Sequence, residues 1–254
     1  MNIDQAKEKF IEYVGNYDLE NEKIRLKLYH SLRVAEVARR IAKDLNINED
    51  LAELIGLLHD IGRFEQIKRF NTFNDKNSID HAILGVEILK QGNFIKEFID
   101  DDSYYETIYI AIENHNKFQI AKDVKGEALV YAKLIRDADK IDILDLHMHE
   151  MDYLKRSGLE EARKTEISDE MWEAFINNKQ TIRKNMCTKA DDFLNEISFI
   201  YDVNYKVSFK IIKENNSVNG LLDIIESEEL LEKDKFSEAR KIANKFIEEK
   251  LEKM

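Results

Sequence analysis

The sequence predicts an all-helical fold, and three features of its composition support that prediction. The 254 residues include no proline and only 8 glycines, so the residues that usually interrupt helices are scarce. Glu, Lys, Leu and Ala, which favour helices, occur throughout the chain. Apolar residues make up 43% of the chain and recur at intervals of three and four, the spacing of one helix face. We therefore expect helices to dominate.

The apolar periodicity also indicates where the helices lie. One helix has recognisable ends: Asn48 is expected to cap it before Glu49, and Gly62 is expected to end it in a left-handed conformation. His59 and Asp60 then fall in its last turn. We expect helices over about residues 3–14, 23–45, 49–61, 79–91, 104–115 and 127–149, and several more between residues 158 and 252.

Two segments show a less regular pattern. Residues 71–77 are rich in Asn and Asp and predict a loop at the rim of a pocket, with Ser78 or Asp80 capping the next helix. Residues 193–209 are expected to be helical or, because aromatic and β-branched residues cluster there, to form a short pair of strands. No Gly/Ser/Pro-rich linker and no internal repeat divides the chain, which predicts a single domain over residues 1–254.

Charge and cysteine content limit the classes of function. The formal net charge of −12 argues against binding to nucleic-acid polymers, although a pocket can still be locally positive. The single cysteine, Cys187, excludes an intramolecular disulfide and favours a reducing compartment. No signal peptide and no stretch of about 20 apolar residues is visible, so we expect a cytoplasmic protein without a membrane partner.

Several polar residues lie on predicted apolar helix faces. His30, His59, His81 and His115 each align with aliphatic residues at helical spacing, and Asp139 lies within a similar aliphatic stripe. One such histidine alone is commonly a core residue satisfied by a hydrogen bond. Four of them and an aspartate, on different helices, are better explained by convergence on shared cations. Imidazole and carboxylate ligands favour a divalent transition metal, namely Mn, Fe, Co, Ni or Zn.

The order of these residues resembles the HD-domain superfamily of metal-dependent phosphohydrolases. The family motif is a His, an adjacent His-Asp pair and a distant Asp, and here these are His30, His59-Asp60 and Asp139. The segments HSLRVAEVA, LIGLLHDIGR and IRDADKIDIL are similar to the family's three motif regions, and DHAILGVEIL is similar to its intervening His helix. The resemblance implies an HD-domain helical core at about residues 22–150 and a helical C-terminal extension at about residues 151–254.

The resemblance also implies a ligand set. His30, His59, Asp60 and Asp139 would bind one metal ion, and His81 and His115 would join them where two ions are bound. Asp60 would then bridge the two ions. Family members with two ions often have a tandem His-His where this chain has His115-Asn116, so one or two ions per chain remain open.

The implied reaction is hydrolysis of a phosphoester or phosphoanhydride, in a nucleotide-like small molecule, by metal-activated water. Cationic side chains near the motif would bind the phosphate groups. Glu65 and Asp75 are candidates to position the water or a sugar. The candidates for catalysis are Asp60, Arg33, Arg63 and Lys140, and the candidates for substrate binding are Arg33, Arg63, Lys76 and Lys140.

Several alternatives stay open at this point. Of the three aspartates in DADKID, the apolar stripe selects Asp139, with Asp142 as an acceptor that orients a ligand and Asp137 on a more polar face. The same ligands would suit an HD protein that senses a nucleotide without turnover, or an HD-family di-iron oxygenase. A helical scaffold without a site is the simplest alternative. The amphipathic C-terminal helices could also pair between chains in a homo-oligomer.

Overall fold

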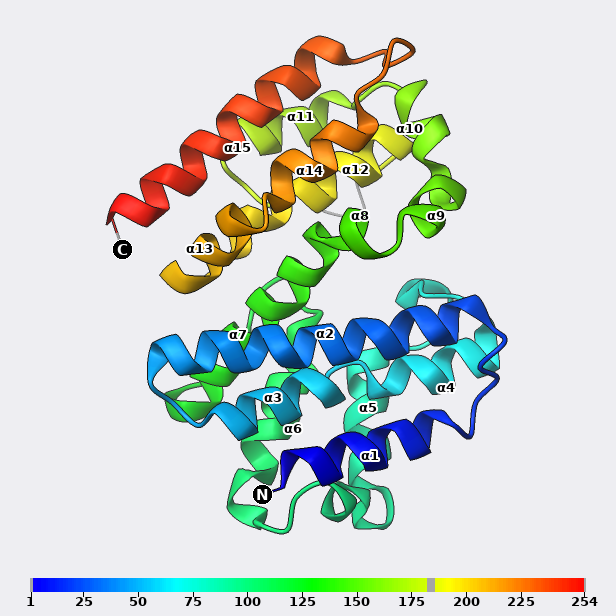
Figure 1. The fold of residues 1–254 in the computed structure, drawn as a ribbon, viewed down its shortest axis with the longest axis vertical. Coiled ribbons are helices and arrows are strands. Elements are labelled where there is room, and N and C mark those ends of the chain that lie inside the picture. Colours follow the sequence, from blue (N-terminus) through cyan, green and yellow to red (C-terminus); the bar gives the residue numbers. More distant parts are fainter. Residues whose placement is uncertain (1, 182–185, 254) are drawn as a thin grey trace. The chain divides into compact units, whose positions relative to one another are not determined.

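The structure is a computed structural model that describes residues 2–181 and 186–253. Every regular element among these residues is a helix, which confirms the predicted all-α class. Contacts divide the chain into two compact units, Met1–Asp139 and Lys140–Met254, here called unit 1 and unit 2. The division falls within helix α7 (Gly126–Leu144), which is continuous in Figure 1. The predicted domain boundaries stay a prediction.

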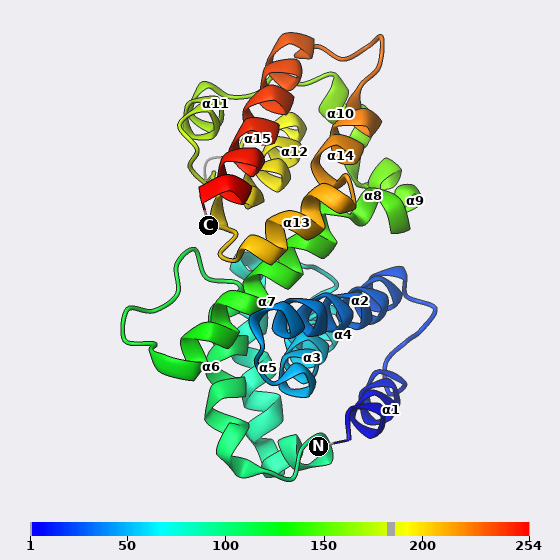
Figure 2. The same ribbon diagram turned by 60° about the vertical axis from the view of Figure 1, so that its left-hand side comes forward.

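Unit 1 contains the predicted motif residues and is built on a central helix. That helix is α3 (Glu49–Leu58), in which the eight residues from Leu51 onward are all buried because LAELIGLL offers almost no polar face. It lies along α2 (Glu22–Leu45) in both views (Figures 1 and 2). Around this pair are α1 (Ile3–Val14), α4 (Ile61–Phe70), α5 (His81–Lys90), α6 (Tyr105–His115) and the short helices η1 (Asp75–Asn77), η2 (Gln91–Glu97) and η3 (Asp102–Tyr104).

Two of the predicted caps are confirmed. The side chain of Asn48 accepts a hydrogen bond from the backbone N–H of Leu51 and so caps α3. Asp80, rather than Ser78, caps α5 by accepting from two backbone N–H groups of its first turn. These caps fix the starts of two helices that carry motif residues.

The prediction for Gly62 is wrong. The helix that begins at Glu49 ends at Leu58, and a further helix, α4, begins at Ile61, so Gly62 is helical and not left-handed. Its lack of a side chain serves packing instead. A Cβ at Gly62 would collide with the backbone oxygen of His81 and lie 2.6 Å from the backbone nitrogen of Gly85, so only glycine lets α4 approach α5 this closely.

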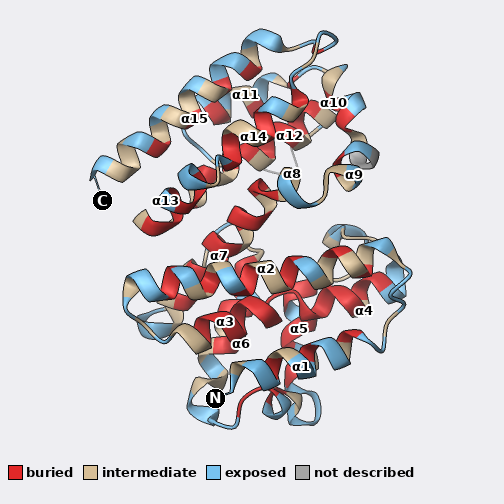
Figure 3. Cartoon of the chain, in the orientation of Figure 1, coloured by how far each residue is buried: buried red, intermediate tan, exposed pale blue. Residues whose placement is uncertain are grey.

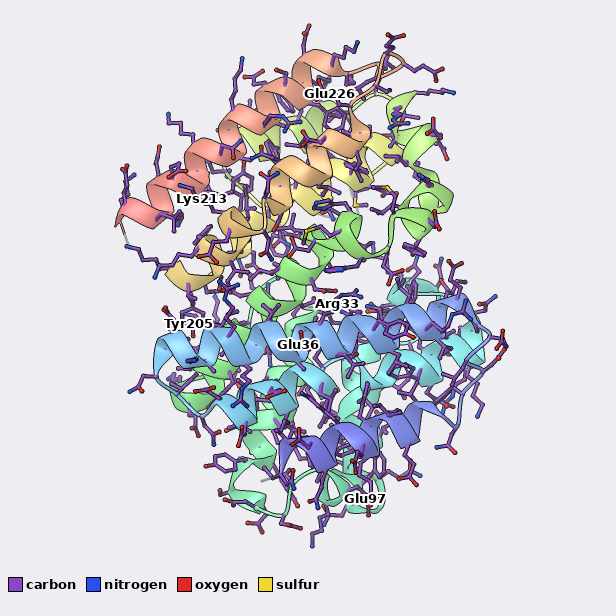
Figure 4. All side chains as sticks on the ribbon, viewed as in Figure 1. Arg33, Glu36, Glu97, Tyr205, Lys213 and Glu226 are labelled. Atoms are coloured by element: carbon purple, nitrogen blue, oxygen red, sulfur yellow. The ribbon has the colours of Figure 1, made fainter. Side chains whose placement is uncertain are left out.

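All regular elements among the described residues of unit 2 are helices. The aromatic residues 193–209 form helices and not a pair of strands, because their apolar side chains recur at helical spacing: Leu194, Ile197 and Phe209 are all buried. Lys213 and Glu248 form an ion pair at 2.6 Å (Figure 4 labels Lys213). The elements are α8 (Leu146–His149), α9 (Met151–Leu154), η4 (Lys155–Leu159), α10 (Glu160–Arg163), α11 (Asp169–Ile176), α12 (Lys189–Ile197), η6 (Ser198–Asp202), α13 (Lys206–Glu214), α14 (Ser217–Ile225) and α15 (Lys233–Lys253).

Each unit has a core of its own. Figure 3 shows that burial is concentrated on α3, α4 and α5 in unit 1, and on α12 and α14 in unit 2. The buried positions of α15 recur every three or four residues, at Phe236, Ala239, Ala243 and Ile247, as expected of an amphipathic helix. Within the described ranges, no helix combines the length and the apolar composition that crossing a membrane requires.

The close approach of α4 to α5 yields a prediction about stability. Gly62→Ala should lower the free energy of unfolding by at least about 2 kcal/mol, because the new methyl group meets backbone atoms that cannot rotate away. Urea unfolding followed by circular dichroism measures the change. Gly15→Ala is the control, expected to stay within about 1 kcal/mol, because Gly15 has an ordinary helical φ of −60° and a Cβ there meets nothing closer than 3.3 Å. Equal losses in the two variants would contradict this account of Gly62.

Candidate metal centre

The six predicted ligand residues converge on one buried place in unit 1, although four helices and the junction between two others carry them. His30 comes from the middle of α2, and His59 and Asp60 occupy the junction between α3 and α4. The other three are His81 at the first residue of α5, His115 at the last residue of α6, and Asp139 in α7. The four histidines and Asp60 are each at most 4% exposed, and the Asp139 side chain is 16% exposed.

One set of ligand atoms, here called the first group, surrounds Oδ2 of Asp60. The Nε2 atoms of His30 and His59 lie 3.2 Å apart, and they lie 3.5 Å and 3.4 Å from this oxygen. Asp139 Oδ1 lies 3.2 Å from His30 Nε2 and 3.7 Å from His59 Nε2. Atoms that bind one ion at about 2.1 Å, with tetrahedral or octahedral angles, are about 3.0–3.4 Å apart. The first group has nearly these spacings.

The other oxygen of Asp60 belongs to a second group. Oδ1 of Asp60 lies 3.2 Å from Nε2 of His81 and 3.5 Å from Nε2 of His115. The two histidine nitrogens lie 3.0 Å apart. Each group thus contains ligand atoms close enough to share one ion. The Asp60 carboxylate presents one oxygen to each group.

The protons on the imidazole rings can be assigned from their partners. Nδ1 of His59 lies 2.7 Å from the Gly56 carbonyl oxygen, and Nδ1 of His115 lies 2.6 Å from the Ile112 carbonyl oxygen. A carbonyl can only accept, so both Nδ1 atoms carry the proton and donate. Nδ1 of His81 likewise donates to a carboxylate oxygen, 2.7 Å away. In the neutral rings, the three Nε2 atoms therefore present lone pairs to the centre.

This assignment leaves the second group without a donor of its own. Nε2 of His81, Nε2 of His115 and Oδ1 of Asp60 are three acceptors within 3.5 Å of one another. Among the described residues, Asp60 Oδ1 has no hydrogen-bond partner, and Nε of Arg63 is 3.6 Å away. Buried acceptors that face one another are unfavourable unless a cation lies between them. The donor set therefore fits a divalent metal ion.

The charges around the centre keep its carboxylates ionised. Burial alone would raise the pKa of Asp60, but Lys27 and His59 outweigh it and hold the pKa well below its usual range. The pKa of Asp139 is likewise lowered, because hydrogen bonding to His30 and the electrostatic interaction with His59 outweigh burial. Burial lowers the pKa of His115 from 6.5 to about 4, so this ring is neutral near pH 7.

The four cationic side chains predicted to bind phosphate differ in their burial and in their partners. Arg63 is buried, and its Nη1 donates to Gln66, to the Phe73 carbonyl and to Asp75, so this nitrogen is fully engaged inside unit 1. Lys140 belongs to unit 2 and pairs with Asp202 at 2.9 Å.

Arg33 and Lys76 remain candidates for substrate binding. Arg33, labelled in Figure 4, lies on α2 three residues after His30, and it is partly exposed. Lys76 is exposed on η1.

The expectation for Asp137 is wrong, and the roles predicted for Glu65 and Asp142 stay predictions. Asp137 is fully buried and does not lie on a polar face, because α7 is packed on more than one side. Glu65 accepts a hydrogen bond from Tyr17 and pairs with Arg69 at 2.6 Å, which ties α4 to the segment after α1. Asp142 is buried in unit 2, so its predicted role toward a ligand stays a prediction.

The sequence interpretation missed two cations, one that contacts Asp60 and one that contacts the backbone at the end of α6. Lys27 Nζ lies 2.6 Å from Asp60 Oδ2 and is the donor for that oxygen. Its position three residues before His30, on the same face of α2, was the available signal. Arg136 is 2% exposed and donates to backbone carbonyls at the end of α6, including those of Asn114 and His115. It thereby closes the C-terminus of the helix that ends at a ligand.

The family model of the HD domain matches residues 28–144. The chain is 30% identical to a deoxyguanosinetriphosphate triphosphohydrolase-like protein of Clostridium tetani, over 53% of this chain and 38% of that protein. It is 29% identical to a protein of the same description from Pelagibacter ubique, over 78% of this chain and 50% of that protein.

A third relative has a different description. The chain is 34% identical to ribonuclease Y of Ureaplasma parvum, over 47% of this chain and 21% of that protein. The matches thus span half or less of the length of these three relatives. No solved structure matches the chain.

The lowered pKa of His115 predicts that acid destabilises the protein. The neutral ring is favoured in the folded state, so the stabilisation is complete above pH 6.5 and is lost as the pH falls toward 4. Between pH 7 and pH 5 the loss should be about 2 kcal/mol, while Asp60 and Asp139 stay ionised. Urea unfolding in a chelating buffer measures it. The free energy of unfolding of His115→Gln should depend less on pH than that of the wild type. An unchanged pH dependence would refute the attribution of this effect to His115.

Proposed function

We propose that this chain, whose residues 28–144 match the HD-domain family model, is a metal-dependent phosphohydrolase acting on a nucleotide-like small molecule. The observation that carries the proposal is the Asp60 carboxylate, which presents one oxygen to each of two groups of histidine nitrogens. A two-ion site of this kind suits the displacement of an oxygen at phosphorus. The bond cleaved is a phosphoester or a phosphoanhydride.

The substrate class rests on the relatives and on charge. The descriptions of two relatives name a deoxynucleoside triphosphate, and that of the third names a ribonuclease. Both descriptions concern phosphate compounds. The net charge of −12 gives this chain little general attraction for a nucleic-acid polymer. A small phosphorylated substrate, most simply a nucleotide, is therefore our proposal. It needs local positive charge, and Lys27 provides it beside Asp60.

A bound Mn, Fe, Co, Ni or Zn ion would supply Lewis-acid activation of water and positive charge for phosphoryl oxygens. The chain's own residues provide the ligand atoms and fix their orientation. His59 and His115 present Nε2 lone pairs because backbone carbonyls hold their Nδ1 protons. Asp60 stays ionised and contributes to both groups, while His30 and Asp139 complete the first. Arg33 and Lys76 are the proposed contacts for the anionic substrate, with Arg63 and Lys140 as further candidates.

Elemental analysis of purified, metal-loaded protein tests the proposal together with a hydrolysis screen. The wild type should hold two ions and hydrolyse a nucleotide or a generic phosphoester with at least one of Mn, Co, Ni, Zn and Fe. Asp60→Ala should lose both ions and at least about 100-fold in kcat/KM, because it removes an oxygen from each group. His115→Ala should lose one ion. Glu36→Gln, an exposed change on α2 (Figure 4), is the matched control and should behave as the wild type.

Other outcomes would favour a different function on the same fold. Metal content unchanged in Asp60→Ala would refute a metal centre here. A protein that holds two ions but hydrolyses no nucleotide and no phosphoester would be better described as a sensor. Two irons per chain with consumption of O₂ would favour an oxygenase, which needs both metal sites filled.

A further inference from the structure

We propose that Asp75 is the positioning residue of the second group, and that it sets how tightly His81 and its partners hold a metal ion. The inference rests on the proposed metal centre and adds a residue that contacts no predicted ion directly. Asp75 lies on η1, in the loop that joins α4 to α5, and its side chain is 29% exposed.

Both oxygens of Asp75 are used to hold the second group in place. Oδ2 accepts from Nδ1 of His81 at 2.7 Å, so it fixes which nitrogen of that ring faces Asp60. Oδ1 accepts from Arg63 at 2.9 Å and from Gln66 at 2.8 Å, two residues of α4. One oxygen of the Asp75 carboxylate is thus held by α4, the helix that follows Asp60. The other oxygen holds the His81 ring.

Asn116 links the same carboxylate to the third ligand of the group. Its Nδ2 donates to Oδ2 of Asp75 at 3.2 Å and to Oδ1 of Asp80 at 2.9 Å, and it directly follows His115. The residue that departs from a tandem His-His thus supports the second group through hydrogen bonds. Asp75 is therefore connected to a residue at or near each ligand of this group: Arg63 after Asp60, His81 itself, and Asn116 after His115.

His81 differs from the other histidines whose Nδ1 partners are known. His59 and His115 donate to carbonyls of their own helices, which are neutral acceptors fixed by the backbone. His81 donates to a charged carboxylate on a separate loop. An anionic partner at Nδ1 makes Nε2 of the same ring a stronger ligand for a cation. It also fixes the orientation of the ring. The second group therefore depends on this loop in a way that the first group does not.

Equilibrium dialysis against Mn²⁺ followed by elemental analysis tests the proposal. The wild type should bind two ions. In Asp75→Asn, the dissociation constant of one ion should rise about 10–100-fold while the other is unchanged, because Asn keeps the size of the side chain and loses its charge. Asp80→Asn is the matched control: it removes the same charge from the same loop, caps α5 equally well, and its side chain makes no hydrogen bond to the His81 ring. It should bind both ions as the wild type does.

A second variant and the control make the outcome decisive. Asn116→Ala removes one donor to Asp75 without changing charge, and it should weaken the same ion by less than Asp75→Asn does. The proposal is overturned if Asp75→Asn binds both ions with wild-type affinity, if it weakens both ions equally, or if Asp80→Asn weakens one ion as much. A wild type that binds one ion also overturns it. Two ions bound without any hydrolysis would overturn the proposed function alone.

Discussion

The carboxylate of Asp60 lies among four imidazole rings with 2% of its surface exposed, where Lys27 donates to one oxygen and no described residue donates to the other. A buried charge costs several kcal/mol unless opposite charges and hydrogen bonds compensate it. Four helices, α2, α5, α6 and α7, and the α3–α4 junction each bring a compensating or ligating group to this point. The arrangement of these helices thus follows from the requirement to keep one carboxylate ionised in an apolar interior.

The break between α3 and α4 makes this convergence possible. Neighbouring residues of one helix point about 100° apart, so an uninterrupted helix would direct His59 and Asp60 to different sides. Asp60 leaves the helical conformation, with φ −106° and ψ 17°, and both side chains reach the same centre. Gly62 then lets α4 lie directly against the backbone of α5, which begins with His81. The backbone geometry at the α3–α4 junction therefore determines where these ligand side chains lie.

The sequence predicted much of this centre because burial leaves a periodic pattern. Histidines and an aspartate on apolar helix faces are unusual, so His30 and Asp139 could be found by their helical spacing alone. The role of Gly62 could not be predicted, since a glycine that ends a helix and one that allows two backbones to touch look alike in one sequence. The contacts of Lys27 with Asp60 and of Asp75 with His81 could not be predicted, because these partners lie 33 and 6 residues apart in the sequence and only the folded chain brings them together.

The hydrogen-bond partners of the His59, His81 and His115 rings also differ in how easily a mutation can remove them. The carbonyls of Gly56 and Ile112 belong to the backbone, so no side-chain replacement at those positions removes the acceptor. The partner of His81 is a side chain, and a single base change converts an aspartate codon to an asparagine codon. The two halves of the centre are thus unequally robust, and a lineage could tune the affinity of one half while the other stays fixed by the main chain.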